Sequence, residues 1–191
     1  GVMAALSFAA YLFFRVPFYG GSSFHLGNTF TALAALLMDG VSGGLAGAIG
    51  LALADVLAGD PGYAITTFVL KFIIGVVCGL TAHRLCRIDT ADPARRLPYV
   101  LRVTASAGSG LLVNVITDPL LGYFRNVYIF GQDYSVAQAL AGVAGGVTLV
   151  NSLVSTACAV LLYLAVRPAL DRAGLLPRRE PKGSVHQAKK A

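Results

Sequence analysis

The sequence predicts an all-α, polytopic membrane protein, a bundle of six transmembrane helices with both termini on the cytoplasmic side. Of its 191 residues, 56% are hydrophobic and only 13% are charged, whereas soluble domains carry about 25% charged residues. The mean hydropathy is +0.71. Charged residues, prolines and glycines divide the chain into six apolar segments. We expect residues 1–166 to form one membrane domain and residues 167–191 to form a disordered, basic cytoplasmic tail.

Each apolar segment ends at a recognisable break in the sequence. Arg15 and Pro17 close the first, the Asp39-Gly40 turn separates the second from the third, and residues 59–62 (Gly-Asp-Pro-Gly) form a strong turn signal before the fourth. A polar, basic loop precedes the fifth. The sixth lies in an uncharged run from 134 to 166, which exceeds one bilayer crossing and predicts a tilted helix. The predicted helices cover about residues 1–18, 27–38, 41–58, 63–85, 99–123 and 136–166.

The distribution of Lys and Arg predicts the orientation. Residues 84–102 and the tail from 167 onward together hold twelve of the 15 basic residues. Two predicted spans separate these regions, so they lie on the same side, and the positive-inside rule makes that side cytoplasmic. The loops at 16–27, 59–62 and 124–135 then face outward. Such basic flanks are explained by anionic lipid headgroups, so we expect contact with the lipid bilayer and no nucleic-acid partner.

Small residues recur at four-residue spacing. Such pairs let helix backbones approach closely in lipid, where no hydrophobic force drives helices together. We therefore expect a tightly packed bundle. The pairs are Gly40/Gly44, Gly43/Gly47, Ala46/Gly50, Gly75/Gly79 and Gly142/Gly146.

Lys71 lies in the middle of the apolar stretch from 63 to 82. A charge near mid-membrane costs at least ~2.5–3.5 kcal/mol, so such a residue marks a functional site by default. Two interpretations remain open at this stage. Lys71 contacts a ligand or relays an ion from a cavity, or it pairs with a structural carboxylate such as Asp55.

Three predicted helices carry a polar stripe on one face. Tyr63, Thr67 and Lys71 are four residues apart, and so are Asn114 and Asp118, with Tyr123 closing that helix. The third stripe, in the sixth predicted helix, follows the 0, 3, 4, 7 spacing of one face and consists of Thr148, Asn151, Ser152 and Ser155. Together they predict a polar pocket open to the outside, covered by the first outward loop. The residues expected to contact a substrate are Lys71, Asn114, Asp118, Asn151, Tyr63, Asn28, His25 and Tyr123.

Several functions are excluded by what the sequence lacks. It contains no Gly-x-x-x-x-Gly-Lys-Ser/Thr motif, so the chain does not cradle nucleotide phosphates itself. The three cysteines are far apart and show no Cys-x-x-Cys spacing, so we expect no metal site. No catalytic residue set is present, and we expect neither an enzyme nor a bound cofactor.

The stretch from His25 to Leu80 resembles the substrate-binding S component of energy-coupling factor (ECF) transporters. The matching features are His-Leu-Gly after the first loop, a Gly-rich third span ending in Ala-Asp, and an aromatic-plus-Thr start to a span whose Lys precedes Gly-x-x-x-Gly. More narrowly, the stretch is similar to the branch that includes riboflavin-, pyridoxine- and hydroxymethylpyrimidine-type uptake proteins. The sequence does not choose among these vitamins.

The resemblance implies a multi-pass protein of a prokaryotic cell membrane that captures a small water-soluble vitamin or precursor from outside. It also implies two kinds of partner, a transmembrane coupling subunit and a pair of cytoplasmic ABC-type ATPases. In this family an Ala-x-x-x-Ala pattern on the first span docks the coupling subunit. Ala5 and Ala9 stand at that spacing here.

Two other functions remain open from the residues alone. A membrane scaffold or assembly protein would use its polar stripes only to lock helices together and would bind no ligand. A solitary carrier would transport without ATPase partners, although the acidic residues of the membrane region are few.

Overall fold

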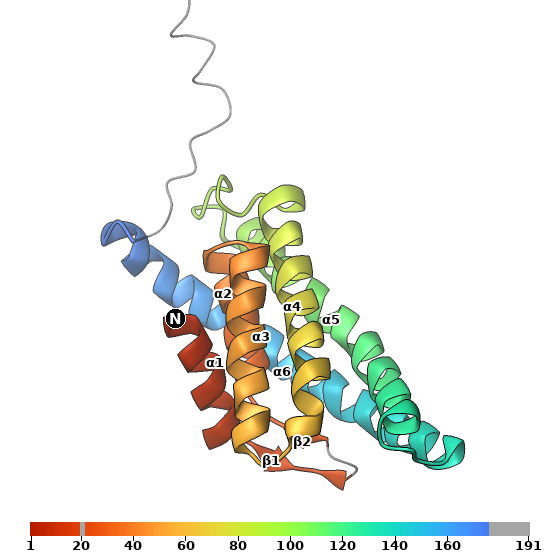
Figure 1. Ribbon diagram of the computed structural model, residues 1–191. Coiled ribbons are helices and arrows are strands. Elements are labelled where there is room, and N and C mark those ends of the chain that lie inside the picture. The colour runs from red at the N-terminus through yellow and green to blue at the C-terminus, as the bar shows by residue number, and fades with distance from the viewer. Residues whose placement is uncertain (20–21, 176–191) are drawn as a thin grey trace, which may run out of the picture.

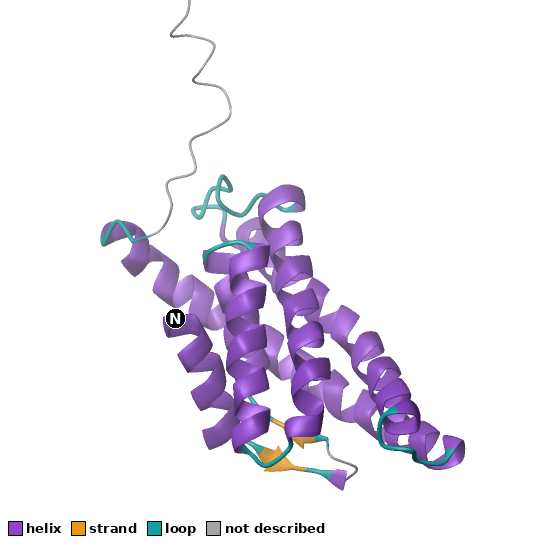
Figure 2. Ribbon diagram, in the orientation of Figure 1, coloured by secondary structure: helices purple, strands orange, loops and turns teal. Residues whose placement is uncertain are grey.

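The computed structural model describes residues 1–19 and 22–175, which form an all-α bundle. Its helices run side by side, and a short antiparallel hairpin covers one end (Figures 1 and 2). In the described residues the order of elements is α1 (Val2–Phe13), β1 (Val16–Pro17), β2 (Ser23–Phe24), α2 (Gly27–Leu37), α3 (Gly40–Leu57), η2 (Pro61–Tyr63), α4 (Ala64–Leu80), η3 (Thr81–Leu85), α5 (Arg96–Tyr128) and α6 (Tyr134–Arg172).

The six predicted segments each correspond to one α-helix, and the largest differences are at the ends of α1, α5 and α6. α1 ends at Phe13, five residues before the predicted end at 18, and Val16–Pro17 form β1 instead. α5 continues five residues past the predicted end at 123, to Tyr128. α6 continues past 166 to Arg172, so the first residues of the predicted tail are helical. The predicted disorder of the tail concerns mainly residues 176–191, which lie outside the described residues.

In the part of the chain that the structure describes, four helices are long and apolar enough to cross a membrane, one of them α4 extended by η2 and η3. They cover Gly40–Leu57, Pro61–Leu85, Arg96–Tyr128 and Tyr134–Arg172. α1 has 12 residues and α2 has 11, which gives lengths of only about 18 and 16 Å at 1.5 Å per residue. Six helices are therefore present in the described residues, and six complete spans remain a prediction.

Local sequence explains the sharp turns on both sides of α3. Asp39 caps its start, because its carboxylate accepts hydrogen bonds from the backbone N–H groups of Val41 and Ser42 at 2.9 and 2.8 Å. At the other end Gly59 adopts a φ of +88°, a conformation that glycine reaches without steric cost. These turns place α3 antiparallel to both α2 and α4.

Two of the predicted pairs, Gly40/Gly44 and Gly75/Gly79, join α3 to α4, whereas Gly43/Gly47 faces α2. A Cβ added at Gly75 would lie within 3.0 Å of the Cα of Gly44, and one added at Gly79 would lie equally close to Gly40. The two backbones are therefore in direct contact, which larger residues would prevent. The pair on α6 behaves differently, since a Cβ at Gly142 or Gly146 would meet nothing within 4 Å.

α2 lies in the middle of the bundle, and ten of its eleven residues are buried. The 86–95 loop and the carboxyl end of α6 lie at one end of the bundle, and the β1–β2 hairpin and the α3–α4 turn lie at the other (Figure 1). The two basic regions thus share one end, as the charge distribution predicts. Which end faces the cytoplasm remains a prediction.

A polar cluster fastens the helices at the end with the basic loop. The His83 Nδ1 atom is hydrogen-bonded to the Asp89 carboxyl group at 2.6 Å. Its Nε2 atom donates to the backbone oxygen of Ala35 at 2.9 Å. Arg167 also pairs with Asp89, at 3.2 Å. The cluster therefore ties α2, η3, the α4–α5 loop and α6 together.

Candidate functional site

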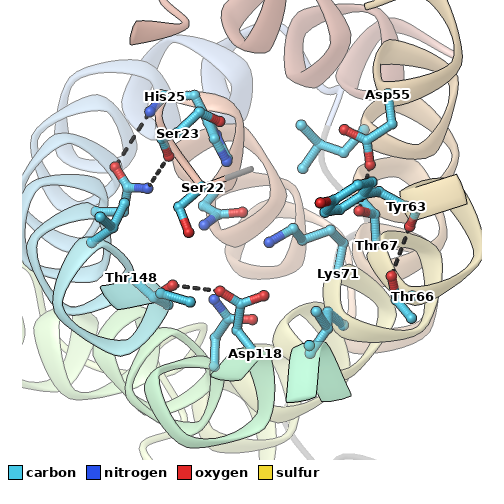
Figure 3. Close-up of a pocket in the computed structure, with 18 of the residues that line it drawn as sticks. Ser22, Ser23, His25, Asp55, Tyr63, Thr66, Thr67, Lys71, Asp118 and Thr148 are labelled. Carbon is cyan, nitrogen blue, oxygen red and sulfur yellow. Dashed lines mark hydrogen bonds between the residues drawn. The ribbon is translucent and has the colours of Figure 1, made fainter. Parts of the chain in front are cut away.

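A cavity of about 90 Å³ opens between the helices near the hairpin end. Figure 3 shows Ser23 and His25 on one side, Asp55 and Tyr63 on another, and Lys71 pointing into the space between them. Residues of all six α-helices, of β2 and the loop residues beside it, and of η2 line it. Seven of the eight predicted substrate contacts are among these residues: His25, Asn28, Tyr63, Lys71, Asn114, Asp118 and Asn151.

Lys71 is buried, with 7% of its surface exposed, and its side chain enters the cavity (Figure 3). Among the described residues no carboxylate lies within the 4.0 Å that would make a salt bridge with it. The Lys71 ammonium group is instead attracted from a distance by two carboxylates, more strongly by Asp118 than by Asp55. The charge is therefore balanced across the cavity rather than neutralised by contact.

Asp55 is committed to other partners. Its carboxylate accepts a hydrogen bond from the Tyr11 hydroxyl at 2.7 Å and another from the Thr67 hydroxyl. These bonds join α1, α3 and α4. The structural interpretation of Lys71, in which it pairs directly with Asp55, is not the arrangement found.

Two asparagines in the cavity wall have unused hydrogen-bonding capacity. Asn114 is 1% exposed, and neither its amide oxygen nor its amide nitrogen has a partner among the described residues. The amide oxygen of Asn28, also 1% exposed, has none either. Buried polar atoms are nearly always hydrogen-bonded, so unpaired ones around one cavity indicate a place where a ligand supplies the partners.

Asp118 and Tyr63 each combine a cavity surface with an internal contact. Asp118 accepts a hydrogen bond from Thr148 at 2.5 Å, which joins α5 to α6 (Figure 3). The Tyr63 ring lies beneath the guanidinium of Arg125, whose Cζ is 3.9 Å from the ring centroid. Arg125 also donates to the Thr66 hydroxyl at 3.2 Å.

Arg125 is a cavity residue that sequence reasoning missed, because the predicted fifth helix ends at 123. In the structure α5 continues through it, and Asn114, Asp118 and Arg125 follow the 0, 4, 11 spacing of one helix face. Extending the polar stripe of the sequence by two more turns would have found it.

His25 and Asn151 lie where the hairpin meets α6. The Asn151 amide nitrogen donates to the backbone oxygen of Ser23 at 2.8 Å, and its oxygen accepts from the backbone N–H of His25 at 3.3 Å. The His25 ring accepts from the backbone N–H of Gly27 through Nδ1 at 3.2 Å. Burial, and then repulsion from Lys71 and Arg15, lower the pKa of His25 to about 3, so the ring is neutral near pH 7.

Tyr123 is not among the cavity-lining residues. Its ring contacts that of Phe124, with centroids 5.7 Å apart. Gly122 does line the cavity, and the next residue along a helix points about 100° away from it. The structure therefore does not bring Tyr123 together with the other predicted contacts.

Ala5 and Ala9, the predicted docking residues, lie on α1 and do not line the cavity. Ala5 is exposed and Ala9 is half-buried, while the neighbouring Ala4 and Ser7 contact α3 at Gly50. The predicted docking pair therefore lies on the side of α1 that α3 leaves uncovered.

Comparison with known proteins identifies the family. Residues 1–168 match the model of one family, described as the ECF-type riboflavin transporter, S component. The matched range contains all residues of the cavity wall. No match was found among curated proteins or among solved structures. The chain is thus a membrane-embedded transport protein with a substrate-binding role, and it belongs to the ECF-type riboflavin transporter S component family.

Proposed function

We propose that this chain captures riboflavin from outside the cell and delivers it to an ATP-driven importer. The observation that carries the proposal is the cavity in which, among the described residues, the Asn114 amide and the Asn28 amide oxygen have no hydrogen-bond partner and Lys71 forms no salt bridge. The family match supports riboflavin over the pyridoxine- and pyrimidine-like ligands, which the sequence alone places ahead of it.

The free groups suit the polar edge of a flavin ring, which presents a carbonyl, an N–H and a second carbonyl in a row. The Asn114 amide offers one acceptor and one type of donor, so it pairs with a neighbouring N–H and carbonyl. Lys71 donates to a carbonyl oxygen, and such charge-assisted bonds are roughly twice as strong as neutral ones. Asp118 accepts from a hydroxyl of the ribityl chain, and Tyr63 supplies an aromatic face.

The importer requires partners. We propose that a transmembrane coupling subunit docks at Ala5 and Ala9, and that two cytoplasmic ATPases supply the Walker motif that this sequence lacks. In this arrangement the hairpin end of the bundle faces outward, both termini are cytoplasmic, and all six helices cross the membrane of a prokaryotic cell.

Titration of the purified protein with riboflavin, followed by the quenching of flavin fluorescence, tests the proposal. We expect submicromolar affinity. Lys71→Ala should weaken binding by about tenfold or more, since hydrogen bonds to charged groups contribute about 1.5–3 kcal/mol. Ile65→Ala is the matched control, because Ile65 is on the same helix but 79% exposed and outside the cavity.

Two results would contradict the proposal. Absence of submicromolar binding by the folded wild-type protein would exclude riboflavin capture. Unchanged affinity in Lys71→Ala, with thermal unfolding like that of the Ile65→Ala control, would remove Lys71 from the binding site.

A further inference from the structure

Arg125, in the last turn of α5, holds Tyr63 at two points. Its guanidinium lies over the Tyr63 ring, with Cζ 3.9 Å from the ring centroid. Its Nη1 group also donates to the Thr66 hydroxyl at 3.2 Å. That hydroxyl donates in turn to the backbone oxygen of Tyr63 at 2.8 Å (Figure 3). The ring and the backbone of Tyr63 are thus both tied to one side chain on another helix.

Phe130, just after α5, packs around the same contact. The Arg125 Cζ is 5.6 Å from the Phe130 ring centroid, and the centroids of the Phe130 and Tyr63 rings are also 5.6 Å apart. Gly62 leaves room for the Phe130 ring, because a Cβ added there would lie 3.1 Å from two of its atoms. The cation of Arg125 therefore lies near two aromatic rings, each of which attracts it through its quadrupole.

Two roles are open to Arg125, which lines the cavity. A direct contact with the ligand is one, because its buried Nε has no hydrogen-bond partner among the described residues. Support of the Tyr63 ring is the other, and the contacts favour it. No hydrogen bond of the Tyr63 hydroxyl is found among the described residues, so the orientation of the ring depends on packing and on the guanidinium above it.

We propose that Arg125 is a positioning residue that holds the Tyr63 ring in the orientation in which it stacks on the bound flavin. The inference rests on the proposed capture function, in which Tyr63 supplies an aromatic face. Tyr63 ends the three-residue helix η2, next to a turn that contains two glycines, and so lacks the support of a long helix. A side chain that is ordered before the ligand arrives loses less entropy on binding, and the affinity is higher for this reason.

A double-mutant cycle, measured by riboflavin titration, separates the two roles. Arg125→Met removes the cation and should weaken binding roughly threefold to tenfold. Tyr63→Leu should weaken binding at least as much. Because the proposed effect of Arg125 passes through the Tyr63 ring, adding Arg125→Met to Tyr63→Leu should change Kd by less than about twofold, which is a strong departure from additivity.

Two further variants complete the cycle. Arg102→Met is the matched control, the same change at an exposed position on α5 outside the cavity, and it should leave Kd unchanged. Arg125→Gln keeps a donor for Thr66 but removes the charge, and it should weaken binding as Arg125→Met does. It also provides the test if Arg125→Met does not fold, which thermal unfolding in detergent reveals.

A second measurement does not depend on riboflavin. The chain contains no tryptophan, so Tyr63→Trp introduces a single indole, the aromatic ring that attracts cations best. Adding Arg125→Met should shift its emission to longer wavelength and raise the rate of acrylamide quenching about twofold or more, because the ring is released toward water. Adding Arg102→Met should change neither. If riboflavin does not bind, this measurement still decides whether Arg125 holds the ring, separately from the proposed function.

Three outcomes would overturn the inference. In the first, neither Arg125→Met nor Arg125→Gln changes Kd while Tyr63 is present. In the second, Arg125→Met weakens binding equally with and without the Tyr63 ring, which makes Arg125 itself a ligand contact. In the third, the emission and quenching of Tyr63→Trp are the same with and without Arg125.

Discussion

Lys71 and Asn114 illustrate how individual residues in this bundle are kept ready for a ligand. Both are buried and neither is satisfied by contact with the described residues. An unpaired polar group in a low-dielectric interior is costly, and this cost is relieved when a ligand supplies the missing partner. The ligand-free cavity therefore gives up stability for affinity.

His25 is expected to lower the stability of the protein in acid. Its pKa in the folded protein is lowered to about 3, whereas an unfolded chain has a His pKa of about 6.5. Between these values the unfolded state binds more protons, so the free energy of unfolding falls as the pH falls from about 6.5 toward 3. His25→Gln should show a smaller loss of thermal stability than wild type over this range.

The measurement is the unfolding temperature in detergent at a series of pH values. Other groups titrate in the same range, so the difference between the wild type and His25→Gln is the quantity that isolates His25. Above pH 7 the two proteins should show the same pH dependence. Parallel curves across the whole range would mean that the imidazole is not held neutral.

Several polar residues of the cavity wall were predictable from the sequence because helical spacing alone places them on shared faces. Tyr63 at the end of η2, Lys71 on α4, and Asn114 and Asp118 on α5 reach the same cavity for this reason. Tyr123 failed because proximity to the end of a helix does not determine which way a side chain points. The bonds of Asn151 depend on the path of a loop, which periodicity does not describe.

At the scale of elements, the α3–α4 pair depends on the absence of side chains at its contact. Gly75→Ala introduces a Cβ within 3.0 Å of the Gly44 backbone. We expect a loss of roughly 1–3 kcal/mol in the free energy of unfolding, the usual cost of overpacking. Thermal or denaturant-induced unfolding in detergent measures this change.

Gly146→Ala is the matched control for that substitution. A Cβ at Gly146 meets nothing within 4 Å, and alanine is the better helix former by about 0.8–1.0 kcal/mol. Gly146→Ala should therefore leave the protein as stable as wild type or make it more stable. Equal destabilisation by the two substitutions would show that the α3–α4 contact is not specific.

The ends of a helix could be predicted from the sequence where a capping or turn residue marks them. Asp39 and Gly59 mark both ends of α3, and the structure follows them closely. No comparable signal marks the end of α5 after Tyr123, where Arg125 and Asn126 resemble a polar loop. They are instead in the last turns of the helix, since Arg125 is held by Thr66 and by the Tyr63 ring.

At the scale of the whole molecule, α1 offers a surface for the proposed coupling subunit. Ala5→Phe and Ala9→Phe would prevent the close backbone approach that small residues allow. Co-purification with a co-expressed coupling subunit and its two ATPases should then be lost, while riboflavin binding by the isolated chain is retained. Leu149→Phe, at an exposed position on α6, is the control and should keep the partners.

Retention of the partners by the Ala5→Phe and Ala9→Phe variants would place the docking surface elsewhere. Loss of riboflavin binding in the same variants would show that α1 shapes the cavity. The arrangement of six helices was predictable because apolar segments and turn residues can be recognised directly in the sequence. The number of complete spans is harder to predict, because α1 is shorter than its apolar stretch suggests and α2 has only 11 residues.

The glycine contact between α3 and α4 has a consequence for the charges in the cavity. α3 and α4 are joined at two places, by backbone contact at the glycine pairs and by the Thr67–Asp55 hydrogen bond nearer the hairpin. We therefore expect the two helices to move together. Asp55 and Lys71 both belong to this pair of helices, so the electrostatic potential that one exerts on the other is constant. Asp118 and Asn114 belong to α5, outside it. We therefore expect a change in the shape of the cavity to come from movement of α5, α6 and the hairpin relative to the α3–α4 pair.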